Sequence, residues 1–390
     1  MSGFGIFIQE NDQEEKRQGI REMGQESKGI QEVKDGQEVK DEKGALGSAV
    51  QAESIRVENM RAEKEKALRN KTIDFELDSE EGRKYASRSL RLGAEGGASE
   101  LSVRTLLDRI ILGDSLEIME KLPRGFVDLL IVDPPYNLAK DYHGTRFQPK
   151  SWEQYREYTE GWLERALPLL KPTASVYVCC DWKSSPIIGE VLHRYLRVQN
   201  RITWQREKGR GAKNNWKNGM EDIWYCTMSS KYTFHLEDVM VRRKVNAPYK
   251  VEGVPKDWEE TAEGNYRNTC PSNFWDDISI PYWSMPENTA HPTQKPEKLM
   301  AKLILASSDR GDVILDPFAG SGTTAVTAGK LGRHFVAVEQ NELYCAWAQK
   351  RLEMAEENPV IQGYRDGVFW ERNSWAEQQR RNSEKNKKST

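Results

Sequence analysis

The sequence predicts an α/β fold built around a mainly parallel sheet, and three observations support this. Beyond residue 100, short apolar runs alternate with longer amphipathic stretches, which is the pattern of consecutive βαβ units. Two of the apolar runs end in an aspartate followed by a proline, at Asp133 and Asp316, and such folds bind ligands at the carboxyl ends of their strands. All twelve tryptophans lie beyond position 150, so we expect the core there.

The first hundred residues have a different composition. They contain 22 acidic and 17 basic residues but four aromatic residues, Phe4, Phe7, Phe75 and Tyr85. Such a segment cannot bury enough apolar surface to offset the entropy lost on folding. We therefore expect residues 1–100 to form a largely disordered, charged N-terminal extension.

The elements of the fold follow in order along the rest of the chain. The apolar runs expected to form seven strands are residues 109–112, 127–132, 174–179, 198–204, 222–227, 313–316 and 335–339. The amphipathic stretches expected to form helices are residues 115–121, 152–170, 186–196, 297–308, 323–331 and 342–355.

Two stretches interrupt the alternation. Residues 205–220 are rich in Gly, Asn and Lys, a composition suited to a loop near a polyanion. Residues 236–288 mix aromatic and polar residues without a clean period, which indicates an inserted recognition region. We expect a catalytic domain in two parts, residues 101–236 and 289–358. An insertion, residues 237–288, separates the two parts, and a polar C-terminal tail follows over residues 359–390.

Charge is distributed unevenly. The net charge of −3 argues against a nucleic-acid partner, because phosphate binding needs clustered Lys and Arg. However, residues 201–220 hold six basic residues against one acidic residue, so the acidic composition elsewhere masks a basic region. Solvated surface is the rival explanation for these charges. The candidates for phosphate contact are Arg206, Lys208, Arg210, Lys213, Lys217, Arg242 and Arg243.

Cysteine usage and hydropathy narrow the class of protein further. The five cysteines have no CxxC spacing, so the sequence predicts neither a disulfide framework nor a metal site. No apolar run approaches the roughly 20 residues that span a bilayer, and the N-terminus lacks the layout of a signal peptide. We expect a cytoplasmic protein that does not bind a membrane.

Residues 313–324, VILDPFAGSGTT, read as a buried strand, a glycine-rich turn and a helix start. Glycines let the backbone approach a ligand, and the turn presents free amides at a helix N-terminus. Gly320, Gly322 and Ala325 also satisfy GxGxxA, with Glu339 at the end of the next strand, so a dinucleotide site is an alternative. Pro317 and Phe318 before the glycines suit a pyrophosphate less well. Acidic residues around the turn instead suit a ligand with positive groups, such as S-adenosylmethionine.

Residues 131–138, IVDPPYNL, place an acidic residue, two prolines and an aromatic residue after another apolar strand. Consecutive prolines remove N–H donors and leave carbonyls free to face a cleft. Asp133 and the Pro134 carbonyl are suited to accept hydrogen bonds from an amino group, while Tyr136 is suited to stack on a base. The sequence thus predicts Asp133, Pro134, Pro135 and Tyr136 as the catalytic residues. They would act directly on the exocyclic amine of a flipped-out base.

Two further segments are expected beside the cofactor. In residues 290–299, AHPTQKPEKL, a polar loop opens onto a helix, so that Thr293 and Lys295 offer donors for a carboxylate. In residues 111–119, Asp114 follows a strand and is placed to accept from an adenine amine, while Ser115 is suited to cap the next helix. The full set of cofactor-binding candidates is Asp114, Asp133, Thr293, Lys295, Asp316, Phe318, Gly320, Gly322, Thr323, Thr324 and Glu339.

Taken together, these motifs resemble those of the DNA amino-methyltransferases, the N6-adenine and N4-cytosine family, as found in bacterial and phage restriction-modification systems. The matching segments are GDS at 113–115, DPPYN at 133–137, HPTQKP at 291–296, DPFAGSGTT at 316–324 and the acidic strand end at Glu339. The resemblance covers about residues 105–355. It implies a circularly permuted, Rossmann-like methyltransferase fold whose seven strands have the order 3-2-1-4-5-7-6, one of them antiparallel.

The resemblance also implies function. It implies methyl transfer from S-adenosylmethionine to double-stranded DNA, and it leaves open a homodimer and a cognate restriction endonuclease as partners. DPPY in place of SPPY favours adenine over cytosine as the target base. The alternatives are an N4-cytosine enzyme, an RNA adenine methyltransferase and a catalytically silent nucleic-acid-binding subunit. Because DPPY has no part in hydride transfer, the dinucleotide alternative is disfavoured.

Overall fold

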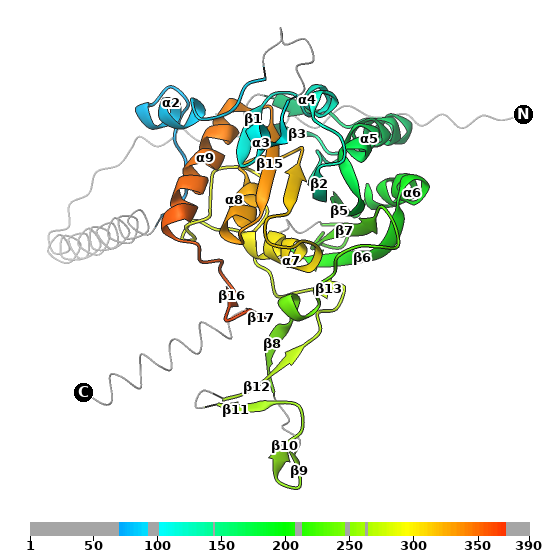
Figure 1. Cartoon of the computed structure of the whole chain (residues 1–390), viewed down its shortest axis with the longest axis vertical. Coiled ribbons are helices and arrows are strands. Elements are labelled where there is room, and N and C mark those ends of the chain that lie inside the picture. The colour runs from blue at the N-terminus through cyan, green and yellow to red at the C-terminus, as the bar shows by residue number, and fades with distance from the viewer. Residues whose placement is uncertain are drawn as a thin grey trace, which may run out of the picture. The chain divides into compact units, whose positions relative to one another are not determined.

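The computed structural model describes residues 70–92, 101–142, 145–206, 213–245, 250–261 and 264–371. At its centre is an eight-stranded sheet of order β1-β15-β14-β2-β5-β7-β6-β13 (Figure 1). The seven expected strands all form: β1 (Arg109–Leu112), β2 (Val127–Val132), β5 (Leu170–Asp181), β6 (Arg197–Gln205), β7 (Met220–Thr227), β14 (Val313–Asp316) and β15 (His334–Glu339). Their order is the one that the family resemblance implied.

The expected count of seven strands is wrong by one. A two-residue strand, β13 (Phe274–Trp275), pairs in parallel with β6 and forms the edge of the sheet. It lies in the insertion and is too short to produce a period in the sequence, and its stability comes from burial of Trp275 rather than from a local pattern. The strand β7 is antiparallel to both of its neighbours, β5 and β6, as the family resemblance implied.

Helices cover both faces of this sheet, and each face has its own apolar core. The helices α4 (Ser115–Lys121), α5 (Trp152–Ala166) and α6 (Ser185–Tyr195) pack on one face. The helices α7 (Glu297–Ser307), α8 (Thr323–Lys330) and α9 (Glu342–Glu357) pack on the other. All six were expected from the sequence. Local caps define their starts: Ser151 and Gln154 form a capping box on α5, and Asn341 caps α9.

The register of the parallel strands brings the motifs together. Leu112 of β1 pairs with Glu339 of β15, and Asp316 of β14 pairs with Ala337. The neighbouring strand β2 ends one residue before Asp133. Because the carboxyl ends of parallel strands meet at one edge, four segments distant in sequence share that edge.

A second, five-stranded sheet has the order β11-β12-β8-β17-β16. Its strands are β8 (Val241–Lys244), β11 (Glu259–Thr261), β12 (Gly264–Thr269), β16 (Tyr364–Arg365) and β17 (Val368–Trp370). The expected polar tail over 359–390 is therefore wrong for its first part. Phe369 and Trp370 are buried, because they complete a sheet begun by the insertion. Residues 372–390 lie outside the described part of the chain.

The remaining elements are short. Within the described residues they are two hairpins, two α-helical segments and two 3-10 turns: β3 (Lys140–Tyr142) with β4 (Thr145–Phe147), β9 (Lys250–Val251) with β10 (Val254–Pro255), α2 (Glu80–Ala86), α3 (Val103–Leu106), η1 (Leu167–Leu169) and η2 (Glu237–Val239). No helix in the described residues is long and apolar enough to cross a membrane.

Residues 70–92 fold, so the expectation of a disordered extension is wrong for them. Tyr85 of α2 is buried against α9, and its hydroxyl donates to Glu353 Oε1 at 2.5 Å. Trp347 Nε1 donates to the Phe75 carbonyl at 3.2 Å. The segment adds Phe75 and Tyr85 to apolar clusters formed with residues of α9, and α2 lies beside α9 (Figure 1). Residues 1–69 and 93–100 lie outside the described residues.

Candidate active site

A cavity of about 260 Å³ lies at the carboxyl edge of β1, β15, β14 and β2. The four predicted catalytic residues line it, and so do all the predicted cofactor-binding residues except Gly322. The fold thus brings together side chains from five separate segments. The cavity has two sides, one around Asp133 and one around the glycine-rich turn.

The Asp133 side is a compact group of charges. Tyr136 Oη donates to Asp133 Oδ1 at 3.0 Å and lies 3.1 Å from Glu221 Oε2. Lys295 Nζ lies 2.5 Å from Asp133 Oδ2 and 3.5 Å from Glu221 Oε2. Arg206 forms an ion pair with Glu221 Oε1. Two carboxylates, two cations and one phenol therefore balance one another on this side.

This balance sets the protonation states. Burial alone raises the pKa of Glu221, but Lys295 and Arg206 outweigh it and hold that pKa below its usual value. Burial lowers the pKa of Lys295, yet Asp133 and Glu221 more than offset this and raise it. Burial and then Asp133 raise the pKa of the Tyr136 phenol well above its usual value. At neutral pH Glu221 is ionised, Lys295 is protonated and Tyr136 is a neutral donor.

The two prolines differ in what their carbonyls do. The Pro135 carbonyl accepts from Tyr155 Oη at 3.2 Å, whereas the Pro134 carbonyl accepts no hydrogen bond from the described residues. Both prolines line the cavity. Asp133 and Pro134 thus bring two hydrogen-bond acceptors to the cavity, and their use by an amino group stays a prediction.

The other side of the cavity holds carboxylates without cations. Asp316 Oδ1 accepts from the Phe318 amide at 3.0 Å. Glu339 accepts from the Gly320 and Asn341 amides, both at 2.8 Å. Within the described residues, neither carboxylate forms an ion pair. Burial raises the pKa of Asp316 to about 7 and also raises the pKa of Glu339.

The turn between these acids depends on glycine. Gly320 and Gly322 have φ values of 52° and 76°, in the left-handed region. A Cβ at Gly322 would lie 2.6 Å from the Ala348 Cβ on α9, so only glycine lets the turn pack against that helix. Gly322 precedes α8 directly, and it supports the turn from behind rather than lining the cavity.

Three predicted roles differ from the observed contacts. Lys295 was expected to face a cofactor carboxylate, but its ammonium group pairs with Asp133 and Glu221. Asp114 rather than Ser115 caps α4, accepting from the amides of Leu116 and Glu117 at 2.9 and 3.2 Å. The Ser115 hydroxyl instead donates to the Pro317 carbonyl and joins two motifs. The partners of Lys295 and of the Ser115 hydroxyl are distant in sequence, whereas the amides that Asp114 caps are local.

The predicted phosphate contacts divide into three groups: arginines in ion pairs, exposed lysines, and residues outside the described part of the chain. Arg206 belongs to the site through Glu221, while Arg242 pairs with Glu259 and lies over the rings of Tyr266 and Trp370. Arg243 pairs with Glu371 at 3.1 Å. Lys213 and Lys217 are exposed on the loop that leads into β7. Lys208 and Arg210 lie outside the described residues.

Glu221, which contacts both Tyr136 and Lys295, was not among the residues predicted from the sequence. A signal was nevertheless present. An acid at the start of an antiparallel strand lies at the same sheet edge as acids at the ends of parallel strands. Glu221 is the second residue of β7, the antiparallel strand of the sheet.

The cavity fits S-adenosylmethionine by its own chemistry. The ligand carries a sulfonium and an ammonium group, and on the side around Asp316 and Glu339 two carboxylates form no ion pair with any residue that the structure describes. The glycine-rich turn adds close backbone approach, and Phe318 adds an apolar wall. The fold and the site therefore define a Rossmann-like, S-adenosylmethionine-dependent methyltransferase.

Comparison with known proteins specifies the family. The family model described as DNA methylase matches residues 127–350, more than half of the chain, so the chain belongs to the DNA methylase family. It is 33% identical over 248 residues to the type II methyltransferase M.HpaI of Haemophilus parainfluenzae, covering 63% of this chain and 74% of that protein. It is 33% identical over 253 residues to the DNA adenine methyltransferase YhdJ of Escherichia coli (strain K12), covering 63% and 83%.

A solved structure is similar over about the same share of this chain. The crystal structure of an M1.HpyAVI–SAM complex is 24% identical and covers 62% of this chain and 98% of that chain, with a TM-score of 0.43. By its match to the family model, the chain is a DNA methyltransferase of the N6/N4 family, and DNA methyltransferases use S-adenosylmethionine.

Proposed function

We propose that this DNA methyltransferase acts on the N6 amino group of adenine. The observation that carries the proposal is that two hydrogen-bond acceptors, the Asp133 carboxylate and the Pro134 carbonyl, belong to residues lining the same cavity. On the other side of this cavity, the carboxylates form no ion pair within the described residues. The DPPY sequence favours adenine, and the related YhdJ is named as a DNA adenine methyltransferase. N4 of cytosine is the alternative target within the family.

The Asp133 side of the cavity, called the acceptor side because it would bind the methyl acceptor, would prepare the amine. Conjugation with the ring makes an exocyclic amine a weak nucleophile, so the site must favour its pyramidal form. Asp133 and the Pro134 carbonyl would accept the two N–H bonds and stabilise the positive charge that develops on nitrogen. Lys295 and Tyr136 hold the carboxylate in one orientation from its other lone pairs.

Tyr136 would form a wall of the base pocket. Its hydroxyl is fixed by Asp133 and Glu221, so its ring has little freedom to rotate. A base in a duplex is out of reach of the cavity and must be flipped out, at an unstacking cost of a few kcal/mol. Stacking on the rigid ring would offset part of that cost.

The side around Asp316, Glu339 and the glycine-rich turn, called the donor side because it would bind the methyl donor, would hold the cofactor. When bound, S-adenosylmethionine supplies an electrophilic methyl group on a positively charged sulfur. Asp316 and Glu339 are the carboxylates available for its cationic and hydroxyl groups, and the Gly320 turn allows the close approach. The free edge of the Asp114 carboxylate is the candidate for the adenine amine.

Product analysis tests this proposal. The full chain would be incubated with duplex DNA and methyl-labelled cofactor, and the nucleosides separated by mass spectrometry. N6-methyldeoxyadenosine as the labelled nucleoside supports the proposal, and N4-methyldeoxycytidine overturns it in favour of the alternative. Label in RNA but not in DNA would contradict the assigned substrate. Absence of transfer together with absence of cofactor binding in calorimetry would indicate a silent subunit.

We also propose that the loop leading into β7 contacts DNA. Lys213, Trp216 and Lys217 are exposed, and the Trp216 side chain is 93% exposed. Trp216 precedes Glu221 by five residues, so their Cα atoms lie within about 18 Å of each other. An indole there can stack on a base, and the two lysines can neutralise phosphates. A homodimer and a cognate restriction endonuclease remain predictions.

Salt dependence tests the role of the loop. Removing both lysines should reduce the slope of log K against log salt by about 1 to 2, and Trp216→Ala should weaken binding without changing the slope. The matched control is Arg243→Ala, because that arginine is paired with Glu371. An unchanged slope in the double lysine variant would contradict the contact.

A further inference from the structure

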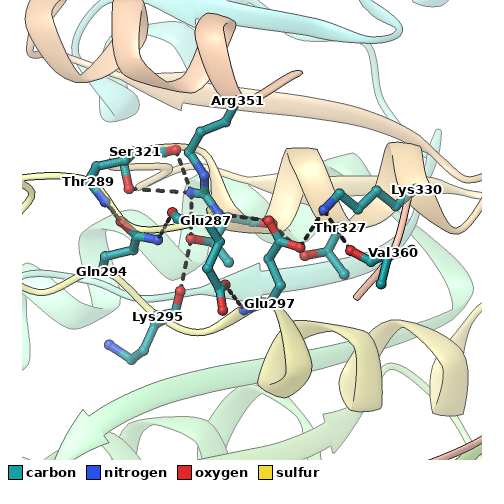
Figure 2. Close-up of polar contacts among 11 residues, drawn as sticks. Glu287, Thr289, Gln294, Lys295, Glu297, Ser321, Thr327, Lys330, Arg351 and Val360 are labelled. Atoms are coloured by element: carbon teal, nitrogen blue, oxygen red, sulfur yellow. Dashed lines mark hydrogen bonds and ion pairs between the residues drawn. The ribbon is translucent and has the colours of Figure 1, made fainter. Parts of the chain in front are cut away.

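Behind the cavity lies a buried polar network centred on Arg351 (Figure 2). Arg351 of α9 is 2% exposed, yet none of the sequence motifs contains it. Its Nη1 donates to the Ser321 carbonyl at 2.8 Å and to Thr323 Oγ1 at 3.0 Å. One guanidinium group therefore holds two residues of the glycine-rich turn.

The same guanidinium group also reaches the segment that carries Lys295. Its Nη2 donates to Glu297 Oε1 at 3.2 Å. The Thr323 hydroxyl, which accepts from Arg351, donates in turn to the Lys295 carbonyl at 3.0 Å. Lys295 is thus held from its backbone by the donor side while its ammonium group holds Asp133 on the acceptor side.

Glu297 fixes the far end of the network. Its Oε2 accepts from Lys330 Nζ of α8 at 2.7 Å, and its backbone amide donates to Glu287 Oε2 at 2.8 Å. Glu287, Glu297 and Arg351 are all more than nine-tenths buried. The Arg351–Glu297 pair consequently joins α7 and α9, and Lys330 joins α8 to the same carboxylate (Figure 2).

We propose that Arg351, through Glu297 and Thr323, is a positioning residue that sets the distance between the cofactor turn and the Lys295–Asp133 pair. This inference rests on the proposed function, in which a methyl group passes from a cofactor at the glycine-rich turn to an amine at Asp133. Direct transfer needs donor and acceptor in line, and a misplacement of about 1 Å can cost about 10²-fold in rate. Stability alone does not call for this pair, because buried ion pairs often stabilise no more than apolar residues of similar size.

Single-turnover kinetics test the proposal. Arg351→Met removes the hydrogen bonds but keeps much of the volume. With DNA and cofactor both saturating, we expect its methyl-transfer rate to fall about 100-fold, and its cofactor Kd to rise by less than about tenfold. Arg351→Lys keeps the charge and should recover part of the rate. Glu297→Gln should lower the rate, and adding it to Arg351→Met should cause little further loss, since both act through one contact.

The control is a second buried ion pair on α7. Lys302 is also 2% exposed and pairs with Asp277 at 2.9 Å, but it contacts neither side of the cavity. Lys302→Met should lower Tm without changing the single-turnover rate. A normal rate in Arg351→Met, or an equal loss in Lys302→Met, would overturn the proposal. Should Arg351→Met fail to fold, Arg351→Lys and Glu297→Gln carry the same comparison. Inactive wild-type protein would instead contradict the proposed function.

Discussion

The two sides of the active-site cavity use the same chemical group in opposite ways. Asp133 and Glu221 are carboxylates paired with Lys295 and, for Glu221, with Arg206 as well. Asp316 and Glu339 are carboxylates that accept from backbone amides and form no ion pair within the described residues. The first pair belongs to a balanced group, whereas the second carries uncompensated negative charge.

The difference indicates what each side is for. A balanced group holds its geometry without a ligand and leaves only directional lone pairs for a neutral amine. An unbalanced acid pair is costly to bury when ionised, and this is why burial raises the pKa of Asp316 to about 7. A cationic ligand removes that cost. This difference supports our proposal that the Asp133 side is preorganised for the amine and that the cofactor completes the side around Asp316 and Glu339.

The largest expected effect is on the acceptor side. Asp133→Ala removes an acceptor for the amine, and we expect the methyl-transfer rate to fall on the order of 10³-fold while cofactor binding persists. Rapid-quench measurement of labelled DNA, with calorimetry of cofactor binding, checks both. Asp309→Ala, on an exposed turn, serves as the control. Near-normal transfer by Asp133→Ala would remove the basis for the comparison.

Loss of Lys295 should break the balance. Lys295→Met leaves Asp133 and Glu221 facing each other with one cation fewer, and we expect a rate loss on the order of 10²-fold. Lys295 is the strongest of the groups that lower the pKa of Glu221, so this pKa should rise when it is lost. The acidic limb of the pH–rate profile should move to higher pH. An unmoved limb would show that Lys295 does not set the ionisation of this group.

On the donor side the expected effect is on binding. Asp316→Asn keeps the size of the side chain and removes its charge, so cofactor Kd should rise about 10- to 100-fold. The rate at saturating cofactor should change much less. Isothermal calorimetry with S-adenosylmethionine and with the neutral product S-adenosylhomocysteine separates charge from shape. Equal weakening for both ligands would contradict a role for Asp316 at the sulfonium, because S-adenosylhomocysteine keeps the ammonium group and lacks only the sulfonium charge.

A smaller effect is expected from pH. Because the pKa of Asp316 is raised to about 7, the free protein loses this negative charge as pH falls through 7. A cationic ligand prefers the ionised form, so affinity should be constant above pH 7 and fall by up to about tenfold per unit below it. Asp316→Asn should be weak throughout and insensitive to pH in this range. The same slope in both proteins would assign the titration to another group.

The sequence alone determined the sheet, the helices and the residues that meet at its edge. Apolar strands ending in Asp133, Asp316 and Glu339 were sufficient for this, because hydrophobic periodicity and strand-end chemistry are local properties. The edge strand β13, the folding of residues 70–92 and the joining of residues 364–370 to the second sheet were not predictable. Each depends on a surface provided by a distant part of the chain.

Tertiary structure alone decided which charges are paired. Lys295 looked suited to a cofactor carboxylate, and Glu221 and Arg351 belonged to no motif. Lys295 pairs with Asp133, 162 residues away, and Glu221 pairs with Lys295, 74 residues away. Arg351 pairs with Glu297, 54 residues away. Ion pairing depends on distances of a few ångströms between side chains, and sequence spacing does not specify such distances across a sheet. The sequence thus supplied the reacting groups, and the fold decided which of them are charged, held in place or left free for a ligand.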